Sequence, residues 1–258
     1  MTHLVPNHSL PQRRPGRFTL ALATAALLAT TLTPNAWAAG SKGGIQPTNP
    51  ENPWDYIGQL HNQALDNIAT DLVAHTPDPN PTQVSMSIWK EAVRISEDKI
   101  GDLDIGAFPF DSLADAATGR GVDLSGLDEE QQSYASQVLE IAGSPDYGPQ
   151  EKIAALIQLE GEVAERLDSK RAFPILASSA VGRYSTAYWH SQDAETSPWN
   201  LYPDTGSFEG ALESPNQIIE ADVGGAIAFF VLGPEGMLIG AAIGSAFSIA
   251  GAIWDWLF

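Results

Sequence analysis

Three histidines follow the first forty residues, and histidine is the side chain best suited to general acid–base chemistry or metal binding. His61 lies four residues after Ile57 and four before Leu65, on the apolar face of its predicted helix. A hydrogen-bonded core histidine is the favoured interpretation, and a pH-sensitive histidine with a carboxylate partner is the alternative. His75 and His190 are expected at helix C-termini, where the helix dipole favours a cation.

The established catalytic and metal-binding spacings are missing from the sequence. The histidines do not form His-Glu-x-x-His, and Ser178, Ser179 and Ser185 lack a Gly-x-Ser-x-Gly context. The acidic segment 98–104 does not have the ligand spacing of a calcium loop. Cysteine is absent, which excludes disulfides and thiolate metal sites. The sequence therefore predicts no metal and no cofactor, and it assigns no catalytic residue.

Amphipathic helices must position these side chains. Asn52-Pro53-Trp54-Asp55 combines a capping asparagine with proline at the first helical position, and it predicts a helix over 52–74. Asp128 and Gln131 form a capping-box pattern, which predicts the start of another helix at 128. Apolar periodicity predicts further helices over 83–99, 128–142, 149–170 and 173–190. No period-two alternation indicates a strand, so the predicted fold is an all-α helical bundle.

The last forty residues form the most distinctive segment. The range 218–258 is apolar and rich in glycine, and it breaks at 233–235. Small residues recur every four positions in its second arm: Gly236, Gly240, Gly244, Ser248 and Ala252. Residues four apart share a helix face, so this row predicts a flat surface that a second helix can approach closely. We therefore expect 213–258 to form a glycine-zipper-like helical hairpin that packs on the body or leaves it.

Three interpretations of this hairpin remain open: the centre of a soluble bundle, a membrane-inserting element, or a surface for self-association. Its second arm is about 27 Å long, close to the thickness of a bilayer core. The apolar run of the first arm, 223–232, is only about 15 Å long. Asp222 precedes it, and a carboxylate inside a membrane costs about 3 kcal/mol. These magnitudes make insertion marginal.

The N-terminus is typical of a secretory signal peptide. Arg13, Arg14 and Arg17 precede an uncharged apolar stretch, and small residues lead to a cleavage site between Ala38 and Ala39. We therefore expect an exported protein: secreted, periplasmic or on the cell surface. The predicted organisation is a signal peptide (1–38), a flexible leader (39–51), a helical body (52–212) and the hairpin (213–258).

The chain is strongly acidic, with 13 Lys and Arg against 32 Asp and Glu and a formal charge of −19. Loss of the three signal-peptide arginines makes the mature chain more negative still. Such a surface repels nucleic acid and anionic lipid headgroups. We expect no nucleic-acid partner, and any membrane binding must come from apolar insertion.

One N-terminal pattern resembles the mature start of a group of uncharacterised exported bacterial proteins: Asn52-Pro53-Trp54-Asp55-x-x-Gly58-x-x-His61-Asn62-x-x-Leu65-Asp66, with Trp54 in place of an expected tyrosine. Further landmarks are the segment 178–189 and Ala221-Asp222-x-Gly224 with the glycine-rich tail. The resemblance implies export and this architecture, and no particular activity. It also points to His61 and Asn62 as part of a polar centre with Asp222 or Tyr184. His61, Asn62 and Asp222 are therefore the candidate site residues.

The favoured function is that of an exported, non-enzymatic protein that interacts with a membrane, or with its own copies, through the hairpin. Its most concrete form is a binding or membrane-interacting protein, such as a pore-forming factor that releases the hairpin. One alternative is a secreted enzyme with a site around His61. Another is a soluble protein that binds a protein partner and uses the hairpin only as core.

Overall fold

The computed structural model describes residues 45–75, 122–192 and 215–257, together with Lys90, Glu91, Arg94, Ser197 and Trp199. For 72–75, 246–247 and 249–257 it describes the backbone alone. All of these belong to one compact unit, Gly40–Phe258. The predicted signal peptide, its cleavage site at Ala38 and Ala39, and most of the predicted helix 83–99 lie outside the described residues.

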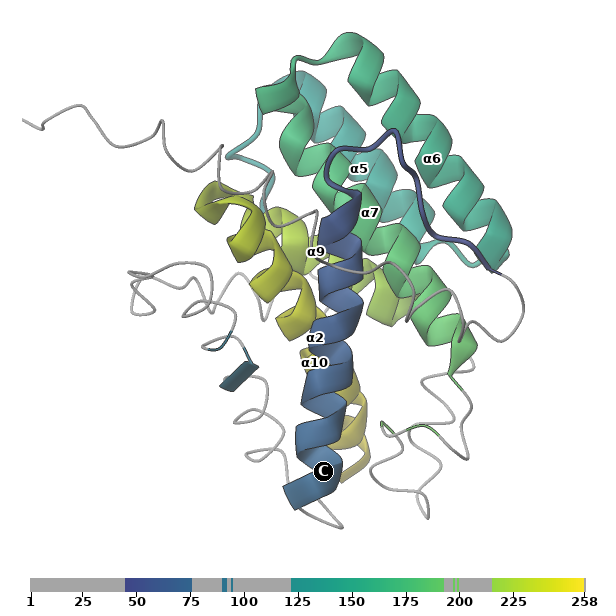
Figure 1. The fold of residues 1–258 in the computed structure, drawn as a ribbon, viewed down its shortest axis with the longest axis vertical. Helices are drawn as coiled ribbons and strands as arrows, with labels where there is room; N and C mark the ends of the chain where they lie inside the picture. Colours follow the sequence, from purple (N-terminus) through teal and green to yellow (C-terminus); the bar gives the residue numbers. More distant parts are fainter. Residues whose placement is uncertain are drawn as a thin grey trace, which may run out of the picture. The chain divides into compact units, whose positions relative to one another are not determined.

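The described part of the chain consists of six α-helices packed against one another, without a strand (Figure 1). This confirms the predicted all-α bundle. The elements are α2 (Asp55–His75), α5 (Glu129–Gly143), α6 (Pro149–Arg166), α7 (Ser169–Ser191), α9 (Asn216–Ala228), the 3₁₀ turn η3 (Phe230–Leu232) and α10 (Gly233–Leu257).

Helix α7 lies at the centre of this bundle. It packs against α2, α5, α6, α9 and α10. Its side chains from Ala172 to Trp189 are all buried except that of Phe173. A helix that is covered on every side is expected to lack a polar face, and α7 carries mainly alanine, serine and aromatic residues there. Small side chains let the neighbouring helices come close to its axis.

Capping residues fix where the middle helices begin. Asp128 Oδ1 accepts from the backbone N–H groups of Glu130 and Gln131, both at 3.1 Å, and Gln131 Oε1 accepts from Asp128 N at 2.9 Å. This is the predicted capping box. The predicted boundary between the fourth and fifth helices, near 170–173, is wrong. Helix α6 already ends at Arg166, because Asp168 accepts from two backbone N–H groups of the next turn and starts α7 at Ser169.

The N-terminal strap, residues 45–51, lies against the body although its composition predicted a flexible leader. Ile45 is buried with Ile153 and Ala187. Asn49 Nδ2 donates to Glu160 Oε2 at 2.6 Å. Helix α2 begins at Asp55 and not at 52, because 52–54 form a turn in which Asn52 Oδ1 accepts from Trp54 N. The residues that contact Ile45 and the Asn49 side chain lie more than a hundred residues away in sequence, so composition alone did not indicate them.

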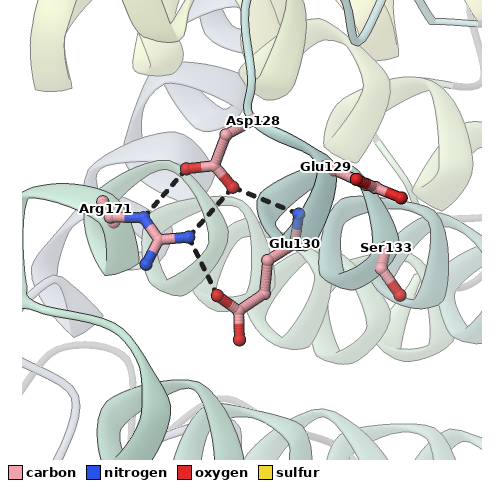
Figure 2. Close-up of a pocket in the computed structure, with 5 residues that line it drawn as sticks. All are labelled: Asp128, Glu129, Glu130, Ser133 and Arg171. Carbon is pink, nitrogen blue, oxygen red and sulfur yellow. Dashed lines mark hydrogen bonds and ion pairs between the residues drawn. The ribbon is translucent and has the colours of Figure 1, made fainter.

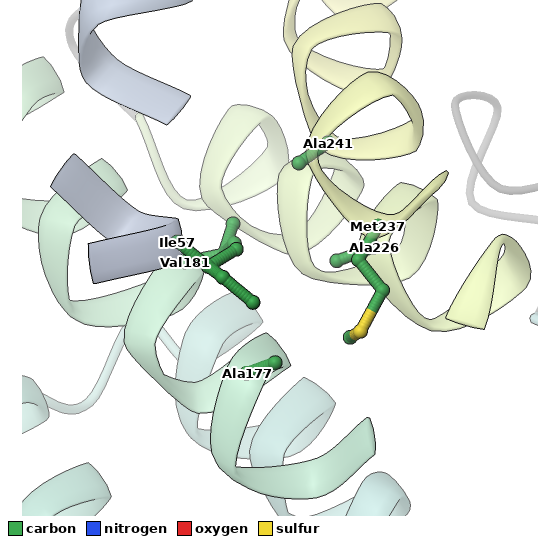
Figure 3. Packing of buried hydrophobic residues seen from close by; sticks show 6 residues of the cluster. All are labelled: Ile57, Ala177, Val181, Ala226, Met237 and Ala241. Atoms are coloured by element: carbon green, nitrogen blue, oxygen red, sulfur yellow. The ribbon is translucent and has the colours of Figure 1, made fainter. Parts of the chain in front are cut away.

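Four helices contribute to the main hydrophobic cluster, which Figure 3 shows from close by. Its members are Ile57 from α2, Ala177 and Val181 from α7, Ala226 from α9, and Met237 and Ala241 from α10. Ile57, His61, Leu65 and Ile68 of α2 are all buried, as the periodicity predicted. The cluster places the hairpin helices inside the bundle.

Helices α9 and α10 run antiparallel and touch backbone to backbone. A Cβ added to Gly240 would overlap the carbonyl oxygen of Gly225, and one on Gly244 would overlap that of Ala221. A Cβ on Gly236 would lie 2.6 Å from Phe229 O. Two rows with four-residue spacing therefore interlock, which is the packing that small residues allow. Of the remaining predicted row, Ser248 is half-buried and the side chain of Ala252 is outside the described residues.

The break between the two arms lies at 229–232, just before the predicted break at 233–235, because those three residues already form the first turn of α10. The turn η3 leads into Gly233, whose φ of 82° is the left-handed conformation that glycine adopts without strain. In the described ranges, no single helix is long and apolar enough to cross a membrane. Asn216–Ala228 and Phe230–Ser245 meet that test only together, as a pair bent by 49° at the break.

Candidate functional site

A buried carboxylate joins four helices at the centre of the bundle. Asp222 of α9 accepts hydrogen bonds at Oδ2 from Ser185 Oγ (2.6 Å) and Trp189 Nε1 (3.2 Å), both of α7. Its Oδ1 accepts from Ser245 Oγ of α10. Asp222, Ser185 and Ser245 expose no surface, and Trp189 is 1% exposed. The hairpin is therefore attached to α7 by polar contacts as well as by apolar packing.

Helix α2 brings His61 and Asn62 to the same carboxylate. His61 Nε2 lies 3.5 Å from Asp222 Oδ2, and His61 Nδ1 lies 3.0 Å from Asn62 Oδ1. Asn62 Nδ2 donates to the backbone oxygen of Tyr184 at 2.9 Å. The structure thus brings together all three candidate residues, with the backbone but not the hydroxyl of Tyr184. We call Asp222, His61, Asn62, Ser185, Trp189 and Ser245 the polar centre.

Burial dominates the acid–base properties of the polar centre. It raises the pKa of the Asp222 carboxyl to about 7, against the hydrogen bonds from Ser185, Ser245 and Trp189, which lower it. It lowers the pKa of His61 to about 4, against the hydrogen bond with Asn62, which raises it. Both shifts favour the neutral forms of the two side chains. Because neither side chain is exposed, the centre as it stands offers a substrate no access.

A second buried cluster is ionic, and no sequence pattern predicted it. Arg183 of α7 donates from Nε to Glu160 of α6 at 2.9 Å, and from Nη2 to Asp55 of α2 at 2.7 Å. Asp55 also accepts from Tyr184 Oη at 2.9 Å and from the backbone of Asn49 at 3.0 Å. The arginine is fully buried between two carboxylates, which is a usual way to hold a charge inside a protein. The cluster ties the strap, α2 and α6 to α7.

A buried lysine holds the end of α5. Lys152 Nζ donates to the backbone oxygens of Ala142 (2.6 Å) and Ser144 (2.8 Å), and to Asn216 Oδ1 (3.2 Å). Burial lowers the pKa of the ammonium to about 8, which the charge of Glu220 partly offsets. Carbonyl oxygens at the end of a helix have no partner within the helix, so the lysine replaces missing hydrogen bonds. This contact joins α6 to the ends of α5 and α9.

An open hollow at the start of α5 is lined by Asp128, Glu129, Glu130, Ser133 and Arg171 (Figure 2). Arg171 donates to Asp128 through Nε (2.8 Å) and Nη2 (3.0 Å), and through Nη2 to Glu130 (2.9 Å). The arginine holds the pKa of Asp128 at about 2. These side chains are engaged in capping α5 and pairing with α7. Their arrangement is explained by the helix ends without a ligand.

Part of the polar centre was predictable from the sequence. The predicted residues His61, Asn62 and Asp222 meet, whereas Ser185, Trp189 and Ser245 carried no spacing signal that marked them. His190 stands at the end of α7 as predicted, and there burial lowers its pKa, with the charge of Lys152 acting in the same direction. Within the described ranges, no group of three His, Cys, Asp or Glu side chains could hold a metal ion.

Comparison with models of known protein families, with curated proteins and with solved structures finds no match to this chain.

Proposed function

We propose that this is an exported, non-enzymatic protein whose working element is the hairpin of α9 and α10, and that the hairpin meets a membrane with its turn. The basic and apolar N-terminus with its Ala38–Ala39 site supports export. The resemblance to exported bacterial proteins supports export too, and we propose that the chain belongs with them.

The turn of the hairpin carries this proposal, because it exposes apolar side chains where a helix connection is usually polar. Val231 is 70% exposed and Leu232 39%. The aromatic side chains of Trp54, Tyr56, Phe173 and Phe230 are partly buried against the core cluster that also holds the two arms of the hairpin. We propose that Val231, Leu232 and these four aromatic residues form one face of the protein, and we call it the apolar turn surface.

The composition of the apolar turn surface suits the edge of a bilayer. Tryptophan and tyrosine concentrate at membrane interfaces, and Val231 and Leu232 can enter the acyl region. The stretch from Phe230 to Pro234 carries no charge, and Glu235 is the first acid after it. Since the whole chain is acidic, we expect it to bind zwitterionic membranes better than anionic ones.

Deeper insertion would follow docking and would need the hairpin to leave α7. The contacts between Gly225 and Gly240 lie inside the hairpin and can move with it. The hydrogen bonds from Ser185 and Trp189 to Asp222 must break, and so must the contact of Asp222 with His61. The same small-residue row is occupied by α9 in this structure, so self-association through it would require α9 to be displaced.

Flotation with phosphatidylcholine liposomes tests whether the hairpin turn binds a membrane. The protein used is residues 39–258, and dye release is measured in parallel. We expect the wild type to float and Val231→Glu to lose most binding, because burying a charge in the acyl region is costly. The matched control is Tyr147→Glu, which alters a side chain that is 42% exposed outside the apolar turn surface. Equal binding of Val231→Glu and wild type would show that the turn is not the contact.

An engineered disulfide separates docking from insertion. A Cβ on Gly182 of α7 would lie 3.1 Å from a γ-carbon of Val223 in α9, close enough for a cysteine pair in a chain without other cysteines. We expect oxidised Gly182→Cys/Val223→Cys to float but release no dye, and reduction to restore release. Each single-cysteine variant, treated with the same oxidant, is the control. Dye release by the oxidised double-cysteine variant would refute insertion of the hairpin.

The burial of the hairpin supports a second candidate, a soluble protein that binds another protein and keeps the hairpin as core. From Gly236 to Ser245 every described side chain of α10 is buried. Failure of the wild type to float with any liposome, together with cooperative unfolding of a monomer, would favour this candidate. The alternative of an enzyme at His61 would require the bundle to open, since His61 and Asp222 expose no surface.

A further inference from the structure

The hydrogen bonds around His61 leave two acceptor atoms facing each other. Asn62 Nδ2 donates to Tyr184 O, so Asn62 turns its oxygen to His61 Nδ1, and Nδ1 must carry the hydrogen. In a neutral imidazole, Nε2 then has only a lone pair. It lies 3.5 Å from Asp222 Oδ2, an oxygen that already accepts from Ser185 and Trp189. Two buried acceptors at this separation repel each other unless a proton lies between them.

We propose that His61 and Asp222 hold one proton between Nε2 and Oδ2, and that this shared proton makes docking of the hairpin onto α2 and α7 insensitive to mild acid. The pair is neutral overall, whether the proton resides on the carboxyl or on the imidazole. The inference concerns docking within the protein and does not depend on whether the hairpin enters a membrane.

Proton counting gives the reason for this insensitivity. In the unfolded chain, with ordinary pKa values of 6.5 for histidine and 3.8 for aspartate, the two side chains hold one proton between pH 3.8 and 6.5. In the folded protein, with pKa values of about 4 and about 7, they also hold one proton over that range. Folding then neither takes up nor releases a proton at this pair, so the pair adds no pH dependence to stability.

The other ionisable groups around Asp222 do not replace this pairing. From α7, Tyr188 faces the carboxylate and has its pKa raised mainly by burial, and Arg183 is bound to Asp55 and Glu160. On α2, Asp66 accepts from Tyr188. On α6, Lys152 is bound to the end of α5, and on α9, Glu220 lies near that lysine. Helix α10 has no ionisable side chain from Gly236 to Ser245. His61 is therefore the group that can share a proton with Asp222.

Two single variants should show opposite pH dependence relative to the wild type. Asp222→Asn leaves His61 with a lowered pKa. Between pH 4 and 6.5, His61 is then protonated in the unfolded state but not in the folded state. The unfolding constant of this variant should rise, relative to wild type, by up to tenfold for each pH unit that is lowered from about 6.5 to 4. His61→Gln leaves Asp222 with a raised pKa, so the folded state binds the extra proton. Its unfolding constant should fall by up to tenfold for each unit over the same range.

The double variant Asp222→Asn/His61→Gln is the decisive control. It has no titrating group at the pair, so its unfolding constant should follow the wild-type pH profile between pH 4 and 6.5, with a constant offset. Urea unfolding at a series of pH values measures all four proteins. Single variants that change in the same direction with pH, or that both follow the wild-type profile, would overturn the shared proton.

A measurement on the unaltered protein covers the case in which a variant does not fold. In the wild type with ¹⁵N-labelled histidine, we expect the His61 ring nitrogens to keep constant chemical shifts from about pH 4.5 to 6.5, with Nδ1 protonated. An imidazole that titrates with its midpoint near its ordinary pKa of 6.5 would overturn the proposal.

Discussion

Asp222 and Arg183 illustrate two ways in which this protein accommodates a buried ionisable side chain. Arg183 lies between Asp55 and Glu160, so its charge is balanced by direct ion pairs. Asp222 is surrounded by neutral donors and one imidazole, and burial raises its pKa to about 7. Because these ion pairs join three helices, we expect the Arg183 cluster to act as a fixed joint between α2, α6 and α7. The protonation of the Asp222 carboxyl, in contrast, depends on its burial and on the hydrogen bonds that it accepts.

Replacing Lys152 should weaken the joint between α5, α6 and α9. In Lys152→Met, the carbonyl oxygens of Ala142 and Ser144 lose their buried donor, and each unsatisfied acceptor costs about 1–3 kcal/mol. We expect the free energy of unfolding to fall by about 2–4 kcal/mol, measured by urea unfolding at neutral pH. Lys170→Met removes an exposed ammonium and is the matched control. A loss in Lys152→Met no larger than in Lys170→Met would mean that water replaces the lysine.

Individual residues were predictable where a helical period or a resemblance singled them out. The four-residue spacing placed His61 on the buried face of α2, and the resemblance pointed to a polar centre of His61 and Asn62 with Asp222 or Tyr184. Ser185, Trp189 and Ser245 lie 37, 33 and 23 residues from Asp222, and nothing local marks them as its donors. Contacts of this kind depend on how helices cross, which the pattern within one helix does not specify.

At the scale of elements, the close packing of α9 and α10 depends on glycine residues at their contact. Where Gly225 meets Gly240, the carbonyl of one helix occupies the space that a Cβ of the other would need. Gly240→Ala should lower the free energy of unfolding by about 1–3 kcal/mol through overpacking, although alanine favours a helix more than glycine does. Urea unfolding of the purified variant measures this loss.

Gly161→Ala is the matched control for the glycine contact, because it makes the same change in an exposed position of α6 with no atom within 4 Å of the added Cβ. At this position the substitution changes only helix propensity and the entropy of the unfolded chain. The free energy of unfolding should therefore rise by about 0.5–1 kcal/mol. The two substitutions should therefore have opposite signs. A gain in both would show that the arms can separate enough to admit a methyl group at little cost.

The elements themselves were predictable to the extent that their ends carry local signals. The capping box at Asp128 and the proline at 149 marked the starts of α5 and α6. The α6–α7 boundary has neither glycine nor proline, and the cap at Asp168 lacks the acid or amide three residues on that completes a capping box. The strap was missed because the Gly and Pro content of the predicted leader 39–51 matches a linker, while Asn49 contacts Glu160 across 111 residues of sequence.

At the scale of the whole molecule, the body and the hairpin share one core, although the sequence suggested separable segments. Helix α9 packs on α5 and α7, and α10 packs on α2. Deletion of residues 214–258 should therefore expose the inner faces of three helices and leave a compact state without fixed packing. We expect helical far-UV circular dichroism, binding of the dye ANS and loss of cooperative thermal unfolding. A truncated chain that unfolds cooperatively would show that the body is a separate domain.

The position of the hairpin at the end of the described chain also sets when the core can close. Of the described helices, α9 and α10 are synthesised after all the others, so α7 is already complete while these two partners are still being made. Until they arrive, Ser185 and Trp189 lack the carboxylate of Asp222, and the side of α7 that faces the hairpin is uncovered. A product that stops before Asn216 therefore leaves the central helix α7 accessible to chaperones and proteases, and only a chain that includes α9 and α10 can cover it.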